Sequence, residues 1–297
     1  MRAPVTSSAF GPEVFTTIWN GLNHPEDLVW DGNRQLLYAG GEQGEIYRGH
    51  LDGTWRMVAT CGEGSFVLGM ALDARGDLYV CEAGNARLLK INATDFTVSE
   101  ISRGTPERPM KCPNYPAFDR EGRLFVSDSG SWGADDGVIY SVSAETGTSV
   151  WATAPHDFTN GIALAPDGRH LYVVESGGSK VWRTTIEDDG SAGESKIVWH
   201  VPGTVPDGLA FDRDGNLYIG CYTPDSIYFL DPWSGDTRLF AHDWSGQRVQ
   251  APTNLAFVGA ELDQLATANL CGRHLNIARD LSIVGLRLHR PEVRSWG

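Results

Sequence analysis

Short apolar runs recur along the chain, and each is followed by a glycine-containing turn and a second apolar run. The stretch "FTNGIALAPDGRHLYVVES", at residues 158–176, shows this arrangement most clearly. The runs alternate or stay apolar for only a few residues, and valine, isoleucine and tyrosine are frequent in them. No window combines a helical period with helix caps. The pattern therefore predicts an all-β chain of short strands joined by tight turns.

The same unit can be aligned six times along the chain. The copies are "PEDLVWDGNRQLLYAGG", "LGMALDARGDLYVCEAG", "PNYPAFDREGRLFVSDS", "TNGIALAPDGRHLYVVES", "PDGLAFDRDGNLYIGCY" and "TNLAFVGAELDQLATANL". The residues that open the copies are 42, 46, 46, 47 and 47 positions apart, the usual length of a four-stranded propeller blade. We predict one domain over residues 1–297, a six-bladed β-propeller of four-stranded antiparallel blades. The segment at about 13–19 should close the last blade, because an open ring would expose sheet edges.

The innermost strands of a propeller line one central channel, so equivalent residues in successive blades form a ring around it. The residues that open the copies are Glu26, Leu68, Asn114, Asn160, Asp207 and Asn254. All except Leu68 carry side-chain oxygen, which suits a hard cation such as Ca²⁺ with its six to eight oxygen ligands. Mg²⁺, Mn²⁺ and Zn²⁺ are alternatives, and the absence of His and Cys from the ring disfavours Zn²⁺. A hydrated channel without metal is the other interpretation.

Further polar and aromatic residues are predicted to lie near the mouth of the channel. Asp128 ends a second strand and opens the long loop "DSGSWGADDG", and His24 and His156 come just before ring positions. We expect substrate contacts from Asn114, Asn254, His24, His156, Asp128, Trp132 and Tyr222. Trp132 and Tyr222 could instead cap a blade, and the two histidines could be ordinary loop residues.

Composition narrows the classes of partner. The chain has 24 Lys and Arg against 38 Asp and Glu, a net charge of −14, so it lacks the basic surface of a nucleic-acid or anionic-membrane binder. No apolar run is long enough for a signal peptide or a membrane-spanning helix. The five cysteines are widely spaced, and the sequence has no C-x-x-C motif. This pattern predicts free thiols in a reducing cytoplasm. The expected partner is a small-molecule substrate, and the oligomeric state is left open.

The stretches "TNGIALAPDGRHLYVVES" and "PDGLAFDRDGNLYI" resemble the six-bladed calcium-dependent lactonases and phosphotriesterases. That superfamily includes gluconolactonase, the senescence marker protein regucalcin, diisopropyl fluorophosphatase and, more distantly, strictosidine synthase. The resemblance covers nearly the whole chain and implies one divalent metal ion. It implies as metal ligands the residues Glu26, Asn114, Asn160 and Asp207. Gluconolactonase-like members usually read R-P-N-D where this chain reads Cys112-Pro113-Asn114-Tyr115, so the resemblance leaves the substrate open.

These features lead to one functional hypothesis and several alternatives. The hypothesis is a metal-dependent hydrolase of a lactone or related ester, with the cation as Lewis acid and Asp207 as general base or nucleophile. One alternative is an arylesterase or phosphotriesterase. Others are a lyase, isomerase or condensing enzyme that reuses the metal pocket, and a non-catalytic calcium-binding propeller. The sequence contains no G-x-S-x-G motif that would indicate a serine hydrolase.

Overall fold

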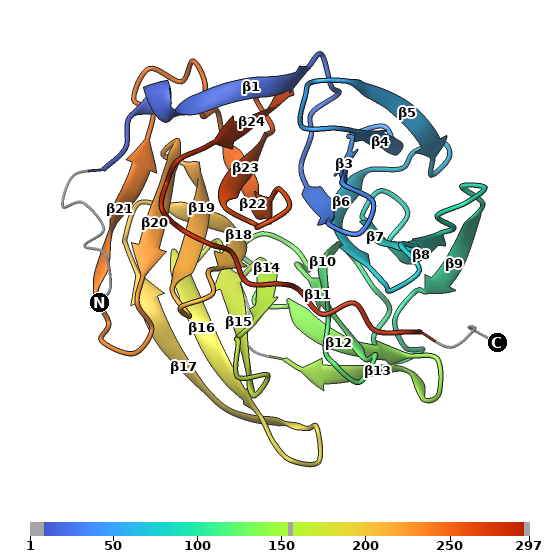
Figure 1. The fold of residues 1–297 in the computed structure, drawn as a ribbon. Helices are drawn as coiled ribbons and strands as arrows, with labels where there is room; N and C mark the ends of the chain where they lie inside the picture. Colours follow the sequence, from blue (N-terminus) through green and yellow to red (C-terminus); the bar gives the residue numbers. More distant parts are fainter. Residues whose placement is uncertain (1–8, 154–156, 294–297) are drawn as a thin grey trace.

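The computed structural model describes residues 9–153 and 157–293. These residues form 24 strands in six four-stranded antiparallel sheets. The sheets are arranged around a common axis, as Figure 1 shows. The predicted six-bladed propeller is thereby confirmed as a fold.

In five blades the four strands follow the chain order, and the first strands of neighbouring blades contact one another around the axis. The first blade is β2 (Leu28–Asp31), β3 (Leu36–Gly40), β4 (Glu45–Gly49) and β5 (Trp55–Thr60), and the second is β6 (Val67–Leu72), β7 (Leu78–Glu82), β8 (Arg87–Ile91) and β9 (Val98–Ser102). The third is β10 (Pro113–Phe118), β11 (Leu124–Asp128), β12 (Val138–Ser143) and β13 (Gly147–Ala152). The fourth is β14 (Thr159–Leu164), β15 (His170–Glu175), β16 (Lys180–Ile186) and β17 (Ala192–His200), and the fifth is β18 (Val205–Phe211), β19 (Leu217–Thr223), β20 (Ser226–Leu230) and β21 (Thr237–His242).

The sixth blade joins the two ends of the chain. It consists of β22 (Pro252–Val258), β23 (Gln264–Asn269), β24 (His274–Ala278) and, as its outer strand, β1 (Phe15–Asn20). A short 3-10 helix, Pro12–Val14, precedes β1. Trp19 of β1 is fully buried, and its indole N–H donates to the carbonyl of His50 in the first blade, at 2.9 Å. Strand β1 therefore links the last blade to the first.

The core lies between the blades. One cluster packs Val29, Tyr38 and Ile46 of the first blade against Met70 and Val80 of the second. The middle strands are apolar without alternation because both of their faces are covered by neighbouring blades. The outermost strands are more exposed, as the burial of β5 and β9 shows. Each blade thus buries its faces against its two neighbours, so the apolar runs of the repeat specify the ring.

The chain continues beyond the last strand as a segment that the repeat did not predict. Figure 1 shows this segment crossing the central opening of the ring. The backbone of Leu286 donates to the Phe211 carbonyl at 2.9 Å, and that of Ala74 donates to the Pro291 carbonyl at 2.9 Å. Gly285 lies so close to Phe257 that a Cβ would meet its side chain at 2.1 Å. Within the described ranges, no helix is long and apolar enough to cross a membrane.

Candidate functional site

The ring residues open the innermost strands, as the repeat predicts. Asn114, Asn160, Asp207 and Asn254 lie in β10, β14, β18 and β22 and are each at most 8% exposed. Glu26 lies just before β2. The Thr253 hydroxyl donates to the Glu26 carbonyl at 2.8 Å, which joins the sixth blade to the first beside the ring. Side chains separated by more than 200 residues therefore meet at one end of the channel.

The innermost strands are irregular at the ring. The pairing of β14 with β15 shifts between Thr159 and Ile162, and that of β18 with β19 shifts between Pro206 and Leu209. Asn160 and Asp207 lie inside these irregular stretches. Such a bulge turns a side chain away from the regular strand geometry. We infer that these bulges direct the ring side chains into the channel.

A glycine follows the ring residue in several blades and allows close approach of neighbouring strands. A Cβ at Gly161 would lie 2.3 Å from the Asp207 carbonyl oxygen, and one at Gly208 would lie 2.6 Å from the Thr253 carbonyl oxygen. Backbone atoms cannot move away from such contacts without shifting a whole strand. The glycines of the N-G and D-G pairs are thus required for the close packing of neighbouring innermost strands at the ring.

Two of the ring carboxamides are oriented by serines. The Asn114 Nδ2 donates to the Ser129 hydroxyl at 3.0 Å, and the Asn160 Nδ2 donates to the Ser176 hydroxyl at 3.1 Å. Each serine in turn donates to a carbonyl of the next blade, Ser129 to Thr159 at 2.7 Å and Ser176 to Pro206 at 2.6 Å. Because the amide nitrogen is held by the serine, the side-chain oxygen of each asparagine is left to face another partner.

Two ring carboxyls share one buried environment. Burial raises the pKa of Glu26 from 4.5 to about 7, although a hydrogen bond from Thr253 opposes the shift. Burial and the negative charge of Glu26 raise the pKa of Asp207 well above its usual range, while a hydrogen bond from Asn160 opposes this. Buried like charges of this kind are stabilised when a cation lies between them.

Asp27 adds a third carboxyl that the repeat alignment did not single out. Its side chain is fully buried, and Oδ2 accepts the backbone N–H of Met70 in the next blade. Burial raises its pKa well above the usual range, and the charge of Glu26 raises it further, against opposing backbone hydrogen bonds. Among the described residues, Glu26 Oε2 and Asp27 Oδ1 are buried oxygens without a hydrogen-bond partner.

The donor set fits a hard cation held by mixed ligands. The described part of the chain contains no group of three or more His, Cys, Asp or Glu side chains that could hold a metal ion. A cation at the ring would therefore use carboxamide oxygens beside carboxylates, as oxygen-liganded Ca²⁺ sites do. The unpartnered Glu26 Oε2 and the serine-oriented asparagines are the observations that favour such a site.

Asp128 has a clear structural function. Its Oδ2 accepts the backbone N–H of Lys111 at 2.8 Å, and its Oδ1 accepts those of Cys112 and Gly130 at 3.1 and 3.0 Å. Glu82, at the equivalent strand end, accepts the backbone N–H of Phe66 in the same way. These side chains hold the loop that enters the innermost strand. Contact of Asp128 with a substrate stays a prediction, and both of its oxygens are already engaged.

The other predicted substrate residues lie in different surroundings. His24 forms a contact with Glu42 on the surface, and Asn254 Oδ1 accepts the backbone N–H of Leu255 at 2.8 Å. Trp132 is 58% exposed and packs against Phe158. His156 lies outside the described residues.

Tyr222 is the predicted contact residue with an electrostatic connection to the ring. Its hydroxyl lies 3.9 Å from the Cys271 thiol. The charge of Cys271 is the main reason for its raised pKa, and Glu26 and Asp207 contribute to the shift. Tyr222 and Cys271 are therefore exposed neighbours, and the charges of the ring carboxyls reach Tyr222.

The repeat alignment did not single out Ser129 and Ser176, although the sequence contains a pattern that marks both. Both follow an acidic residue at the end of a second strand, as "DS" at 128–129 and "ES" at 175–176. These are the two blades whose serines hold the ring asparagines. Cys271 had no such signal. Asp27 directly follows the ring residue Glu26, but the other copies have Gly, Tyr or Leu at this position, so the alignment did not mark it.

A model of the SMP-30/gluconolactonase/LRE-like region matches residues 24–268. Diisopropyl-fluorophosphatase of Loligo vulgaris is 28% identical over 258 residues, which cover 76% of this chain and 81% of that protein. Lactonase drp35 of Staphylococcus haemolyticus is 25% identical over 204 residues, which cover 66% of this chain and 63% of the lactonase. That second match spans less than two thirds of the lactonase.

Among solved structures, the calcium-binding protein regucalcin of Agrobacterium tumefaciens has the same fold. Its TM-score is 0.76 at 15% identity, covering 98% of this chain and 100% of the regucalcin chain. At this identity the likeness concerns the fold alone. The sequence match extends over most of the chain, from two residues before Glu26 to β23 of the sixth blade. The chain therefore belongs to the SMP-30/gluconolactonase/LRE-like family.

Proposed function

We propose that this chain is a hydrolase of a lactone or a related ester that depends on a divalent cation, with Ca²⁺ as the preferred ion. The observation that carries the proposal is the orientation of the ring oxygens. Serines hold the nitrogens of Asn114 and Asn160, and Glu26 Oε2 is buried without a partner. The names of two relatives, a fluorophosphatase and a lactonase, support a hydrolase, and the lactonase supports a lactone or related ester as the substrate.

Glu26, Asn114, Asn160 and Asp207 would hold the ion. When bound, a divalent cation supplies Lewis acidity toward a carbonyl or phosphoryl oxygen. Asp207 then accepts the proton of an attacking water, or its carboxylate attacks the ester itself. Because the ring side chains are buried, little bulk water competes for these groups, and their charges act more strongly than they would in solution.

The chemistry of the rim favours a substrate without net charge. Burial, together with the negative charge of Asp128, raises the pKa of the Cys112 thiol to about 11, so the thiol is neutral at pH 7. Lys111 forms an ion pair with Asp136 at 2.6 Å. Where an R-P-N-D sequence would supply a free guanidinium, this chain thus offers no unpaired cation from these two positions.

A chelation and add-back assay on a panel of small lactones and aryl esters tests the proposal. We expect one bound divalent ion per chain, loss of hydrolysis on chelation and its return on adding Ca²⁺ or Mn²⁺. Hydrolysis that survives complete removal of the ion would contradict the proposal. A bound ion with no turnover on any ester would favour a lyase, an isomerase or a non-catalytic calcium-binding propeller instead.

Oxygen tracing separates the two roles of Asp207. One turnover in water enriched in heavy oxygen places the label in the Asp207 peptide if its carboxylate attacks and is regenerated by water. Label in the product alone favours Asp207 as general base.

Phosphotriester hydrolysis is a second candidate activity. The fluorophosphatase match covers 76% of this chain, against 66% for the lactonase match. A tetrahedral phosphoryl group and a carbonyl group both present an oxygen that a cation can polarise. An uncharged phosphotriester added to the same panel tests this candidate, and a kcat/KM above that of every lactone would favour it.

A further inference from the structure

A cavity lies at the end of the channel opposite the ring. Its volume is about 390 Å³, within the range of small-molecule sites. The final residues of the innermost strands line it, among them Leu72, Phe118, Leu164 and Phe211. Leu164 follows the ring residue Asn160 by four positions, about 13 Å along an extended strand. The cavity is therefore separate from the ring site.

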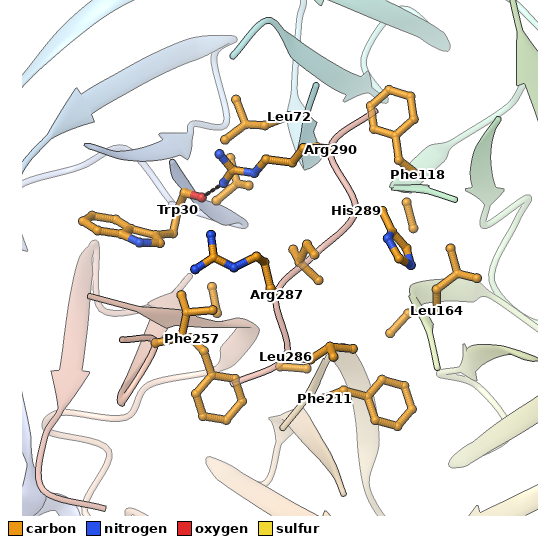
Figure 2. Close-up of a pocket in the computed structure, with 18 of the residues that line it drawn as sticks. Trp30, Leu72, Phe118, Leu164, Phe211, Phe257, Leu286, Arg287, His289 and Arg290 are labelled. Atoms are coloured by element: carbon orange, nitrogen blue, oxygen red, sulfur yellow. Dashed lines mark hydrogen bonds between the residues drawn. The ribbon is translucent and has the colours of Figure 1, made fainter. Parts of the chain in front are cut away.

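The C-terminal segment covers this cavity as a strap, defined here as residues 286–290. Figure 2 shows Leu286, Arg287, His289 and Arg290 extending from the strap among the apolar side chains of the cavity. Leu286 and Pro291 fasten the strap at its two ends through backbone hydrogen bonds to the fifth and second blades. The strap thus places polar side chains over an otherwise apolar cavity.

The strap carries an excess of positive charge. Arg290 donates to Asp31 Oδ1 at 2.8 Å, and Arg34 donates to Asp31 Oδ2 at 3.0 Å. Arg287 has no hydrogen bond or ion pair within the described part of the chain, yet it lies near enough to Arg290 for its charge to disfavour the Arg290 cation. Two guanidiniums therefore bind Asp31, and a third, Arg287, lies near them without a carboxylate partner among the described residues, in a protein whose net charge is −14.

A buried donor lies beside these charges. Trp30 lines the cavity and is only 5% exposed, and its Nε1 is buried without a hydrogen-bond partner among the described residues. Leaving such a donor unpaired costs free energy, so an acceptor at this place would be favoured. Figure 2 shows Trp30 on the same side of the strap as Arg287 and Arg290, while His289 lies on the other side.

We propose that this cavity binds an amphipathic carboxylate, with its apolar body among Leu72, Phe118 and Leu164 and its carboxylate on Arg287. A guanidinium binds a carboxylate through two parallel hydrogen bonds. Arg287, which has no ion pair among the described residues, is available to form both at the edge of this apolar cavity. The indole N–H of Trp30 is the further donor on that side. This site is independent of the ester-hydrolysing function proposed for the ring.

The test is calorimetric titration of the full chain with decanoate, kept below the concentration at which it forms micelles. We expect one site per chain, and decanol, which has no charge, should bind about tenfold more weakly. Arg287→Gln should weaken decanoate binding about tenfold and abolish the difference between decanoate and decanol. Arg287 is exposed and its side chain has no hydrogen bond or ion pair among the described residues, so we expect this variant to remain folded.

Two control variants locate the bound probe. Arg169→Gln removes another exposed arginine, which forms an ion pair with exposed Asp188, and should leave decanoate binding unchanged. Asp207→Asn alters the ring and should also leave it unchanged. Absence of decanoate binding, equal binding by Arg287→Gln and the original chain, or loss of binding in Asp207→Asn would each overturn the proposal.

Discussion

The two ends of the channel are built by the same innermost strands but have opposite character. At the ring end, Glu26, Asp27 and Asp207 are buried carboxyls with raised pKa values. At the far end, the same strands finish in large apolar side chains such as Phe118 and Phe211, and the strap adds arginines. The ring end suits a cation, and the far end suits an anion that has an apolar body.

The difference shows how a repeated strand can serve two purposes. Strands β14 and β18 begin with a polar ring residue in an irregular stretch and end in regular, apolar pairing, as in Asn160 and Leu164 of β14. The polar ends come from the blades themselves, so the repeat determines them. The positive charge of the far end comes mainly from a single segment outside the repeat.

The largest expected effect is on the ring end. Asp207→Asn should lower kcat/KM by about 10²–10⁴-fold, because the variant can neither accept a proton nor attack as a carboxylate. The amide oxygen can still face a cation, so we expect bound metal to be largely retained. Steady-state kinetics with elemental analysis measures both. Asp214→Asn, in the exposed turn at the other end of β18, is the matched control, and full activity in Asp207→Asn would contradict the assigned role.

A smaller effect is expected from the serine that orients a ring carboxamide. Ser176→Ala frees the Asn160 amide to rotate, and the loss of such a supporting contact typically weakens metal binding about 10–100-fold. Calcium titration by calorimetry measures this change. Ser191→Ala, in an exposed turn of the same blade, should have no effect, whereas Ser176→Thr should restore part of the affinity. An unchanged Kd in Ser176→Ala would show that Asn160 is oriented by other contacts.

The smallest expected effect is on the pH dependence of stability. Burial raises the pKa of Glu26 from 4.5 to about 7, so the folded state binds this proton more tightly than the unfolded state does. The resulting contribution to the free energy of unfolding is complete below about pH 4.5. That contribution is lost as the pH rises through about 7. The melting temperature of metal-depleted protein should therefore fall by a few degrees between pH 5 and pH 8, by this linkage.

Added Ca²⁺ should raise the melting temperature more at pH 8 than at pH 5, since protons compete with the ion for Glu26. Thermal unfolding with and without Ca²⁺ checks both statements. Glu26→Gln should flatten the profile of the metal-depleted protein, and a profile identical to that of the unsubstituted chain would assign the pH dependence to other groups.

The repeat predicted much of the fold and the membership of the ring. Spacing between Asn114, Asn160, Asp207 and Asn254 was enough to place them in equivalent positions, because each blade repeats the same strand order. The structure adds a contact for one loop residue that the repeat did not predict. Asp128 holds the loop before β10, and its predicted contact with a substrate stays a prediction. Spacing does not distinguish a side chain that faces the channel from one that faces its own backbone.

The sequence by itself determined the number of blades, the strand order and the oxygen-rich ring, because periodic apolar runs can be buried only between repeated blades. Tertiary structure alone decided which carboxyls share a buried environment, how Ser129 and Ser176 orient their asparagines, and where the strap crosses. These features depend on contacts between different blades, or between a blade and a segment without any period. Contacts of this kind leave no regular pattern along the chain, so Arg287 and Trp30 became neighbours of one cavity only in the folded protein.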